Sequence, residues 1–206
     1  MNDLFSSEGK EQLALPGGDL ILFRAPDLGA DYASIFESVQ REVAWREEPI
    51  QLFGKRYMQP RLLAWYADAG VSYKYSGIRH DGLPWTPQLA VLRTRIEALS
   101  GSRFNSVLAN LYRNHRDSMG LHADDEPELG PSPVIASLSL GEERVFRLKH
   151  RFDKTLKPVK LPLPSGTLLI MRGDTQANWR HEVPKQSKVC GARINLTFRY
   201  VHTSSR

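Results

Sequence analysis

Residues 193–200 read RINLTFRY, and this stretch decides the fold. Polar and apolar side chains alternate along it without interruption, which is the period of a β-strand. One face would be polar and the other apolar: Arg193, Asn195, Thr197 and Arg199 against Ile194, Leu196, Phe198 and Tyr200. We expect a strand whose apolar face packs on a hydrophobic core.

The polar face of this strand has two interpretations. If it points inward, two guanidinium groups, an amide and a hydroxyl line a cavity, which is costly unless an anion binds there. A dicarboxylate would satisfy that face, because an arginine binds a carboxylate through two parallel hydrogen bonds. In the alternative, the face is solvated, as one face of an antiparallel sheet often is.

The rest of the chain predicts further strands and two helices. Apolar or alternating runs, separated by Gly, Pro, Asn and Asp, indicate strands at residues 20–23, 106–112, 134–140, 144–148 and 166–171. Apolar residues recur at helical spacing in residues 31–43 and 87–99. Residues 1–19 lack such a pattern and are expected to form a flexible lead-in. The sequence therefore predicts a mainly β fold with flanking helices (α+β), built as a sandwich or barrel.

Composition limits the class of protein. The chain has 206 residues, 41% hydrophobic and 25% charged, as in an ordinary globular protein, so we expect residues 1–206 to form one domain. No apolar run approaches the roughly 18 residues of a membrane span, and residues 1–8 do not read as a secretion signal. The single cysteine, Cys190, agrees with a reducing compartment. We expect a monomer in the cytoplasm, or in the nucleus of a eukaryote, with no membrane contact.

A His-x-Asp motif is the most informative tripeptide. In a strand, residues two apart share a face, so the side chains of His122 and Asp124 would converge. His181 follows further along, in an expected loop at residues 179–184. Two histidines and one carboxylate form the facial triad of non-haem Fe(II) oxygenases. An isolated His-x-Asp is more often a surface hydrogen bond, so this motif alone is weak.

The strand at residues 106–112 carries a related feature, because Asn110 and Tyr112 share its face and both can hydrogen-bond a carboxylate. Taken together, the order Asn-x-Tyr, His-x-Asp, His and Arg-x-Asn-x-Thr-x-Arg resembles the AlkB family of Fe(II)- and 2-oxoglutarate-dependent dioxygenases. The matching motifs span residues 110–200, about half of the chain.

The resemblance implies a double-stranded β-helix (jelly-roll) as the catalytic core at about residues 104–202. It implies Fe(II) bound by His122, Asp124 and His181, with O2 as oxidant. It implies 2-oxoglutarate bound by the polar residues Asn110, Tyr112, Arg193, Asn195 and Arg199, with Thr197 nearby. In this family one oxygen atom of O2 enters succinate, and the other hydroxylates an alkyl group of a damaged base. A hydroxylated methyl group is then released as formaldehyde, and the base is repaired.

Residues 50–80 look like the nucleotide-recognition lid of the family's duplex-DNA repair branch. There, Phe53 would probe the base stack and Tyr75 would stack on a flipped base, because aromatic faces replace lost stacking. The other expected substrate residues are Arg61, Trp65, Tyr73, Ser76, Asp125 and Glu126. In the structural alternative, the tyrosines belong to a half-buried strand, Phe53 is core and the two acids form a solvated turn.

A basic run occupies residues 144–151, and Lys154, Lys157 and Lys160 follow it. With a net charge of +5, it predicts phosphate contacts through Arg147, Lys149 and Arg151. A solvated hairpin is the alternative.

The resemblance, together with these features, implies an oxidative demethylase of N-alkylated bases, such as N1-methyladenine and N3-methylcytosine, with alkylated DNA as partner. Two alternatives remain open. The same chemistry could act on modified RNA or a protein side chain, or the protein could sense 2-oxoglutarate and bind nucleic acid without catalysis.

Overall fold

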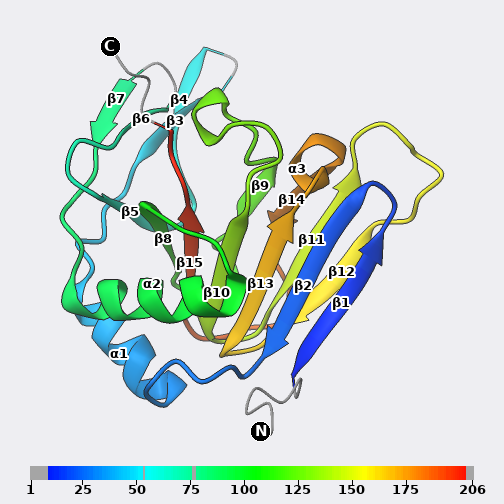
Figure 1. The fold of residues 1–206 in the computed structure, drawn as a ribbon. Helices are drawn as coiled ribbons and strands as arrows, with labels where there is room; N and C mark the ends of the chain where they lie inside the picture. The colour runs from blue at the N-terminus through cyan, green and yellow to red at the C-terminus, as the bar shows by residue number, and fades with distance from the viewer. Residues whose placement is uncertain (1–8, 53, 76–77, 203–206) are drawn as a thin grey trace, which may run out of the picture.

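Two antiparallel β-sheets pack face to face in the residues that the structure, a computed structural model, describes: 9–52, 54–75 and 78–202 (Figure 1). The larger sheet has the order β1 (Lys10–Leu15), β2 (Gly18–Arg24), β13 (Thr167–Arg172), β10 (Ile135–Gly141), β15 (Arg193–Arg199), β8 (Ser106–Tyr112) and β5 (Leu62–Ala67). The smaller sheet has the order β12 (Val159–Leu163), β11 (Arg144–His150), β14 (Trp179–Val183) and β9 (Met119–His122). This arrangement confirms the expected jelly-roll core.

The central strands of the larger sheet are buried on both faces. Leu20 and Leu22 of β2 join a cluster that includes Phe146 and Leu148 from the smaller sheet. Ile21 between them joins a second cluster on the opposite face, against the helices. Because side chains alternate along a strand, one sheet separates an inner core, between the sheets, from an outer core beneath the helices.

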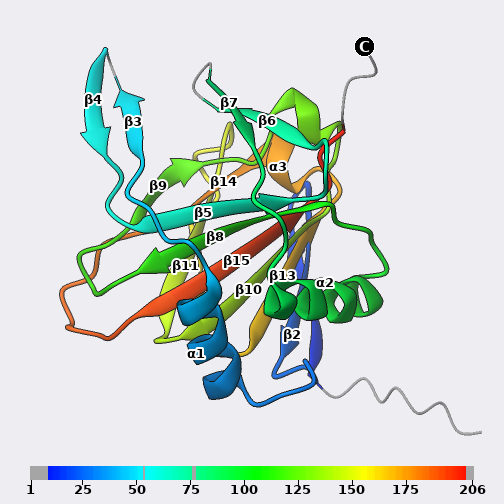
Figure 2. The same cartoon turned by 90° about the vertical axis from the view of Figure 1, so that its left-hand side faces the viewer.

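The two predicted helices lie over the outer face of the larger sheet (Figures 1 and 2). In α1 (Tyr32–Glu42), the N-cap Asp31 accepts a hydrogen bond from the main-chain N–H of Ser34 at 2.9 Å. In α2 (Pro87–Ser100), proline occupies the first turn and Gly101 ends the helix with φ 68°. Among the described helices, none has both the length and the apolar character that crossing a membrane requires.

Strand β15 shows which interpretation of its polar face is correct. All seven of its residues are buried. Ile194, Leu196 and Phe198 face the helices in the outer core, so the polar residues point between the sheets. The solvated interpretation is therefore wrong. Tyr200 follows the strand and is 46% exposed, so it does not belong to the apolar face.

Three local expectations need correction. Residues 10–15 are not a loose lead-in, because β1 pairs with β2 along its whole length and Leu15 is buried; residues 1–8 lie outside the described ranges. His181 lies on β14 rather than in a loop. Asp124 follows the end of β9, so it does not share a strand with His122. β1 forms a hairpin with the neighbouring β2, whereas pairing with β9 and β11, which are distant in sequence, makes His181 part of a strand.

The segment predicted as the lid contains two hairpins on either side of a sheet strand. The first consists of β3 (Pro49–Leu52) and β4 (Lys55–Met58), and the second of β6 (Ser72–Tyr75) and β7 (Ile78–Asp81). Figure 2 shows the first hairpin projecting from the body. Strand β5, between the hairpins, is one of the two edge strands of the larger sheet, β1 being the other. The short elements η1 (Pro127–Leu129) and α3 (Thr175–Asn178) complete the described fold.

Candidate active site

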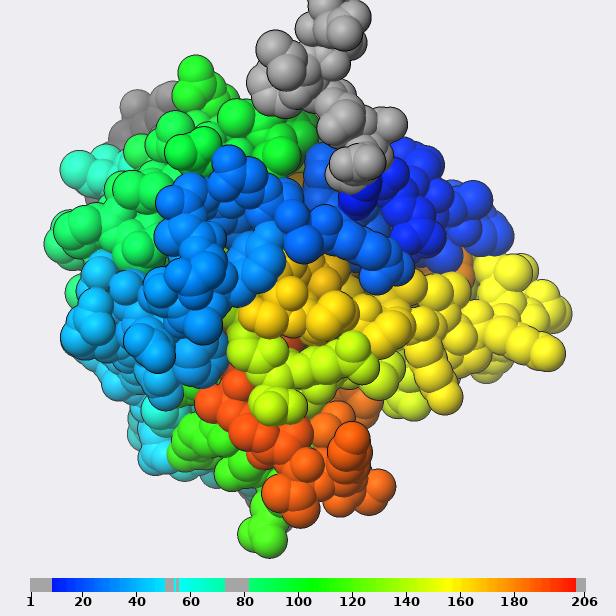
Figure 3. Space-filling model, turned by 90° about the horizontal axis from the view of Figure 1, so that it is seen from below, coloured from blue at the N-terminus to red at the C-terminus, as the bar shows by residue number. Residues whose placement is uncertain are grey.

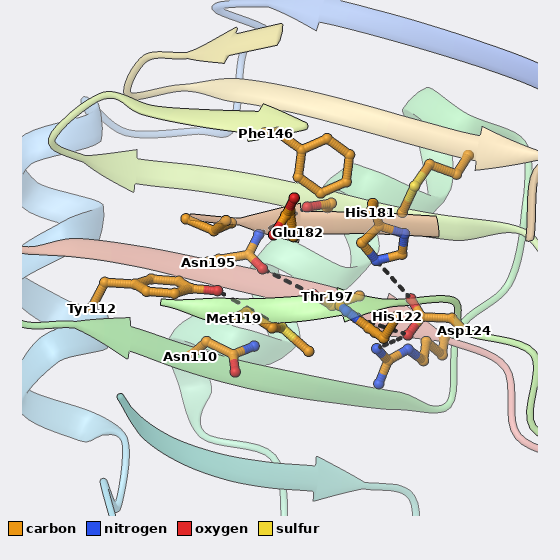
Figure 4. A pocket seen from close by; sticks show the side chains of 14 residues that line it. Asn110, Tyr112, Met119, His122, Asp124, Phe146, His181, Glu182, Asn195 and Thr197 are labelled. Atoms are coloured by element: carbon orange, nitrogen blue, oxygen red, sulfur yellow. Dashed lines mark hydrogen bonds and ion pairs between the residues drawn. The ribbon is translucent and has the colours of Figure 1, made fainter. Parts of the chain in front are cut away.

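His122 and His181 are direct cross-strand partners on β9 and β14. Their ring centroids lie 4.3 Å apart, and Asp124 turns back toward both rings (Figure 4). The His122 Nε2 and His181 Nε2 atoms lie 3.8 Å and 3.9 Å from the carboxylate oxygens Oδ1 and Oδ2 of Asp124. The potential ligand atoms of the three residues all lie within 4.8 Å of one another. The fold thus assembles the predicted triad from separate parts of the chain.

The triad fits a metal ion. Asp124 is 2% exposed, and its Oδ2 atom has no hydrogen-bond partner in the described part of the chain. A buried carboxylate oxygen without a partner is destabilising unless a cation compensates it. Two imidazoles and one carboxylate are the donor set that Fe(II) prefers in a site with open positions.

The protonation states also suit metal binding. Burial and the nearby His122 lower the pKa of His181 to about 3, although Asp124 opposes the shift, so the imidazole is neutral at ordinary pH. Burial opposes the ionisation of Asp124, but Arg199 and the two histidines outweigh it and lower the pKa of this carboxyl. A neutral imidazole and an ionised carboxylate are the forms that bind a metal.

Neighbouring groups hold each ligand in place. The His122 Nδ1 atom lies 2.8 Å from the main-chain oxygen of Gly120, so the tautomer that donates there leaves Nε2 for a metal. The main-chain N–H of Asp124 donates to Gln176 Oε1 at 2.9 Å. Arg199 Nη2 donates to Asp124 Oδ1 at 2.6 Å. The triad is therefore supported by both sheets and by α3.

A cavity adjoins the triad, and its wall includes five of the six residues predicted to bind 2-oxoglutarate (Figure 4). These are Asn110, Tyr112, Asn195, Thr197 and Arg199. The remaining wall residues are the triad and six that the sequence analysis did not single out: Met119, Ser137, Phe146, Met171, Glu182 and Val183. No sequence motif marks most of these six as site residues, and it is the packing of the two sheets that places them at the cavity.

Hydrogen bonds fix the polar wall. Asn195 Nδ2 donates to Ser137 Oγ at 2.8 Å, and Thr197 Oγ1 donates to Asn195 Oδ1 at 3.1 Å. Arg61, predicted to bind substrate, is buried and donates from Nε to Asn110 Oδ1 at 2.7 Å. This bond fixes the orientation of the Asn110 amide. The structure thus places Arg61 behind the polar wall of the cavity.

Arg193, the sixth residue of the predicted set, packs against the Tyr112 ring, with its Cζ atom 5.2 Å from the ring centroid. Its Nη2 atom donates to Ser139 Oγ at 2.8 Å. Its buried Nε and Nη1 atoms make no hydrogen bond to the residues that are described. Unsatisfied guanidinium nitrogens beside a polar cavity fit an anionic ligand such as a carboxylate.

The predicted substrate residues are only partly placed. Asp125 is paired with Arg151 at 2.6 Å, and a buried Oε2 atom of Glu126 has no hydrogen-bond partner within the described ranges. Trp65 is half-buried on β5 and packs against the inner core. Phe53 and Ser76 lie outside the described residues. The backbones of Tyr73 and Tyr75 belong to β6, and their side chains also lie outside what is described.

The predicted phosphate-contact residues lie on and beside β11. Lys149 is exposed, Arg147 forms an ion pair with Glu182, and Arg151 holds Asp125. Arg144, at the start of the basic run, is not on the surface, because its side chain is 1% exposed. Alternation along β11 turns Arg144 inward with Phe146 and Leu148, which a run of basic letters does not reveal.

Comparison with known proteins agrees with this geometry. Residues 29–199 match the family described as the 2OG-Fe(II) oxygenase superfamily. The alpha-ketoglutarate-dependent dioxygenase alkB homolog 3 of Bos taurus is 46% identical over 181 residues, which cover 84% of this chain and 63% of that protein. The Homo sapiens protein of the same name is 45% identical over 180 residues, covering 84% and 62%. The chain thus spans a little under two thirds of these relatives.

A further relative leads to the same family, and a solved structure shares the fold. The DNA oxidative demethylase ALKBH2 of Homo sapiens is 38% identical over 181 residues, covering 84% of this chain and 69% of that protein. The structure of OsALKBH1 superposes with a TM-score of 0.65 at 20% identity, covering 92% of this chain and 100% of the other, which is a likeness of fold. The expected resemblance is confirmed, and the chain belongs to the AlkB family of the 2OG-Fe(II) oxygenase superfamily.

Proposed function

We propose that this protein is an Fe(II)- and 2-oxoglutarate-dependent oxidative demethylase that removes alkyl groups from N-alkylated bases in DNA. The observation that carries the proposal is the buried triad, in which Arg199 contacts the metal carboxylate Asp124 and also lines the adjoining polar cavity. Because one arginine contacts both the metal site and the dicarboxylate site, the two sites suit a reaction in which the dicarboxylate binds next to the metal ion.

The residues have separate tasks in this proposal. His122, Asp124 and His181 would hold Fe(II). When bound, the iron activates O2, and 2-oxoglutarate is the reductant of that reaction. Arg199 binds the part of the cosubstrate nearest the metal. Tyr112 and Arg193, toward the other end of β15, bind its second carboxylate. Asn110, Asn195 and Thr197 orient it through the hydrogen-bonded wall. Burial of this site protects the protein from its own oxidant.

Nucleic acid is the substrate class that the surface favours. The net charge of +5 attracts a polyanion, and two hairpins flank the strand β5, whose inner face carries Trp65. Two acidic residues, Asp125 and Glu126, directly follow Asp124 in the sequence. Their carboxylates can accept hydrogen bonds from an exocyclic amine or attract a cationic alkylated base. An enzyme acting on a base must extract it from the stack.

Two relatives bear on the choice of nucleic acid. The name of the human relative ALKBH2 describes a DNA oxidative demethylase, and alkB homolog 3 is named for its 2-oxoglutarate-dependent chemistry alone. DNA is therefore our first proposal. Modified RNA, a protein side chain and non-catalytic sensing of 2-oxoglutarate become outcomes of the experiment. A cytoplasmic or nuclear location is part of the same proposal.

The test is mass spectrometry of N1-methyladenine oligonucleotides after incubation with protein, Fe(II), 2-oxoglutarate and ascorbate. Single-stranded DNA, duplex DNA and RNA of one sequence are compared, with His122→Ala and a mixture without 2-oxoglutarate as controls. We expect loss of the methyl group from DNA only with wild-type protein and cosubstrate. Greater turnover on RNA would move the substrate class, and succinate without demethylation would point to another substrate. Binding of 2-oxoglutarate without succinate would overturn catalysis.

A further inference from the structure

Arg144 is a buried cation that the proposed chemistry does not use. It begins β11, its side chain is 1% exposed, and the described residues offer it no carboxylate partner. Its guanidinium instead donates to main-chain oxygens: Nη2 to Asp117 at 2.9 Å and Pro184 at 2.6 Å, and Nη1 to Asn114 at 3.2 Å. Burying a cation without an anion is costly, so the burial of Arg144 must be offset by what this side chain does in the folded protein.

The three carbonyls belong to the segments that end or begin strands of the site. Asn114 and Asp117 lie between β8, which ends at Tyr112, and β9, which carries His122. Pro184 directly follows β14. Figure 3 views the molecule from this end and shows the orange segment around residues 184–192 beside the yellow-green turn after β10. The Glu142 N–H donates to the Ala192 oxygen there at 3.0 Å. The hydrogen bonds of Arg144 thus connect the segment between β8 and β9 to the segment that follows β14.

Arg144 also shares an aromatic neighbour with Arg193. The Cζ atoms of Arg144 and Arg193 lie 5.7 Å and 5.2 Å from the centroid of the Tyr112 ring. Burial lowers the pKa of Arg193; Tyr112 opposes this shift, and the positive charge of Arg144 adds to it. Two cations that repel each other behind one wall of the cavity make that wall positive. An anionic group bound against Tyr112 would relieve the repulsion.

This positive wall lies away from the metal. Arg193 and Arg199 occupy opposite ends of β15, six residues apart, and their side chains lie on the same face of the strand. Arg199 contacts the triad at one end, and the pair behind Tyr112 marks the other. A ligand that spans the cavity therefore meets one positive group near the metal and two at its far end.

We propose that Arg144 is a positioning residue for 2-oxoglutarate: it holds the Tyr112 ring, against which Arg193 packs, and adds positive charge where the carboxylate distant from the metal binds. The inference rests on the proposed placement of 2-oxoglutarate. Arg144 does not touch the cosubstrate, because Tyr112 separates it from the cavity. It sets affinity for the far carboxylate, whereas the metal end is held by other groups.

The experiment compares two anions on protein loaded with Mn(II) in the absence of oxygen. 2-Oxoglutarate reaches both ends of the cavity, whereas oxalate can occupy only the metal end. Calorimetry gives both dissociation constants for wild type, Arg144→Gln and Arg144→Lys, with Arg41→Gln on the exposed face of α1 as a control for lost charge. Arg193→Gln reports on the placement of the ligand itself.

We expect Arg144→Gln to weaken 2-oxoglutarate binding roughly tenfold, a typical effect of losing an outer-shell partner, while oxalate changes less than about twofold. Arg144→Lys keeps the charge but not the fork of donors, so its loss should be smaller. If Arg144→Gln does not fold, Arg144→Lys carries the same comparison.

Equal weakening of both anions would make Arg144 a general structural residue, and no change in either would also overturn the proposal. Failure of the proposed function looks different, because wild-type protein would then bind 2-oxoglutarate no better than oxalate. Unchanged 2-oxoglutarate binding in Arg193→Gln would show that the placement is wrong, and the role of Arg144 would fall with it.

Discussion

Asp124 is held at three points, each from a different part of the chain. Arg199 of the larger sheet contacts its Oδ1 atom, Gln176 of α3 accepts its main-chain N–H, and two histidines of the smaller sheet face its oxygens. A metal ligand needs a fixed direction as well as the right chemistry, and outer partners supply that direction. Two of these contacts lead to residue-scale predictions.

Arg199→Ala should affect both stability and cosubstrate binding. Without metal, the variant leaves the buried Asp124 carboxylate without its guanidinium partner, so we expect a loss of about 3 kcal/mol in the free energy of unfolding. The KM for 2-oxoglutarate should rise at least about tenfold, because a charge-assisted hydrogen bond is lost. Urea unfolding of the apo protein and steady-state kinetics measure the two effects. Wild-type values for both would contradict the shared role, and Arg199→Lys should recover part of the stability.

Gln176→Leu should weaken metal binding. The change preserves approximate size but leaves the Asp124 N–H buried without an acceptor, at a cost of about 1–3 kcal/mol. We expect the dissociation constant for Mn(II), measured by electron paramagnetic resonance, to rise about tenfold. Gln40→Leu on the exposed surface of α1 makes the same chemical change elsewhere. A lower melting temperature with unchanged Mn(II) affinity would reduce Gln176 to a packing role.

At the scale of elements, turns determine how strands and helices meet. Gly101 ends α2 at φ 68°, and Gly141 ends β10 at φ 83°. Both need a backbone conformation that side chains with a Cβ atom disfavour. Their surroundings differ, because a Cβ on Gly101 would meet nothing within 4 Å, whereas one on Gly141 would lie 2.5 Å from the Ala192 oxygen. The two sites therefore separate backbone strain from steric clash.

Gly101→Ala should cost about 1 kcal/mol in the free energy of unfolding, from backbone strain alone. Gly141→Ala should cost about 3 kcal/mol, because the added methyl also pushes against the Ala192 carbonyl and the Phe36 ring. Urea denaturation of the two variants gives both values. Equal losses would show that the turn after β10 yields easily, contrary to the packing described.

For the whole molecule, the site joins the two sheets of the sandwich. The histidines belong to the smaller sheet and Arg199 to the larger, with Asp124 between them. A metal ion bound by the folded state alone stabilises that state by mass action. Binding should therefore raise the melting temperature of the entire fold.

Mn(II) at 100 times its dissociation constant should add about 2.7 kcal/mol of stability, which for a chain of this size is roughly 5–10 °C in melting temperature. Scanning fluorimetry without oxygen measures the shift, and excess EDTA should reverse it. His122→Ala should keep its fold but lose the shift. A shift that persists in this variant would place the metal at another site.

Much of this protein is determined by the sequence itself. The strict alternation of residues 193–200 is enough to predict β15, and capping residues mark both helices because local hydrogen bonds and backbone preferences act over a few residues. The types and order of His122, Asp124 and His181 likewise predict a metal centre, since ligand chemistry is a property of side chains.

Only the tertiary structure decided where charged and irregular segments lie. The basic run predicts a surface position for Arg144, yet the pairing of β11 turns its side chain inward. Arg61, expected to bind substrate, is buried against Asn110 instead. Pairing with strands distant in sequence makes residues 179–183 the strand β14, and the fold brings Gln176 to Asp124. Contacts between residues far apart in sequence arise when the sheets close on one another, and no local pattern encodes them.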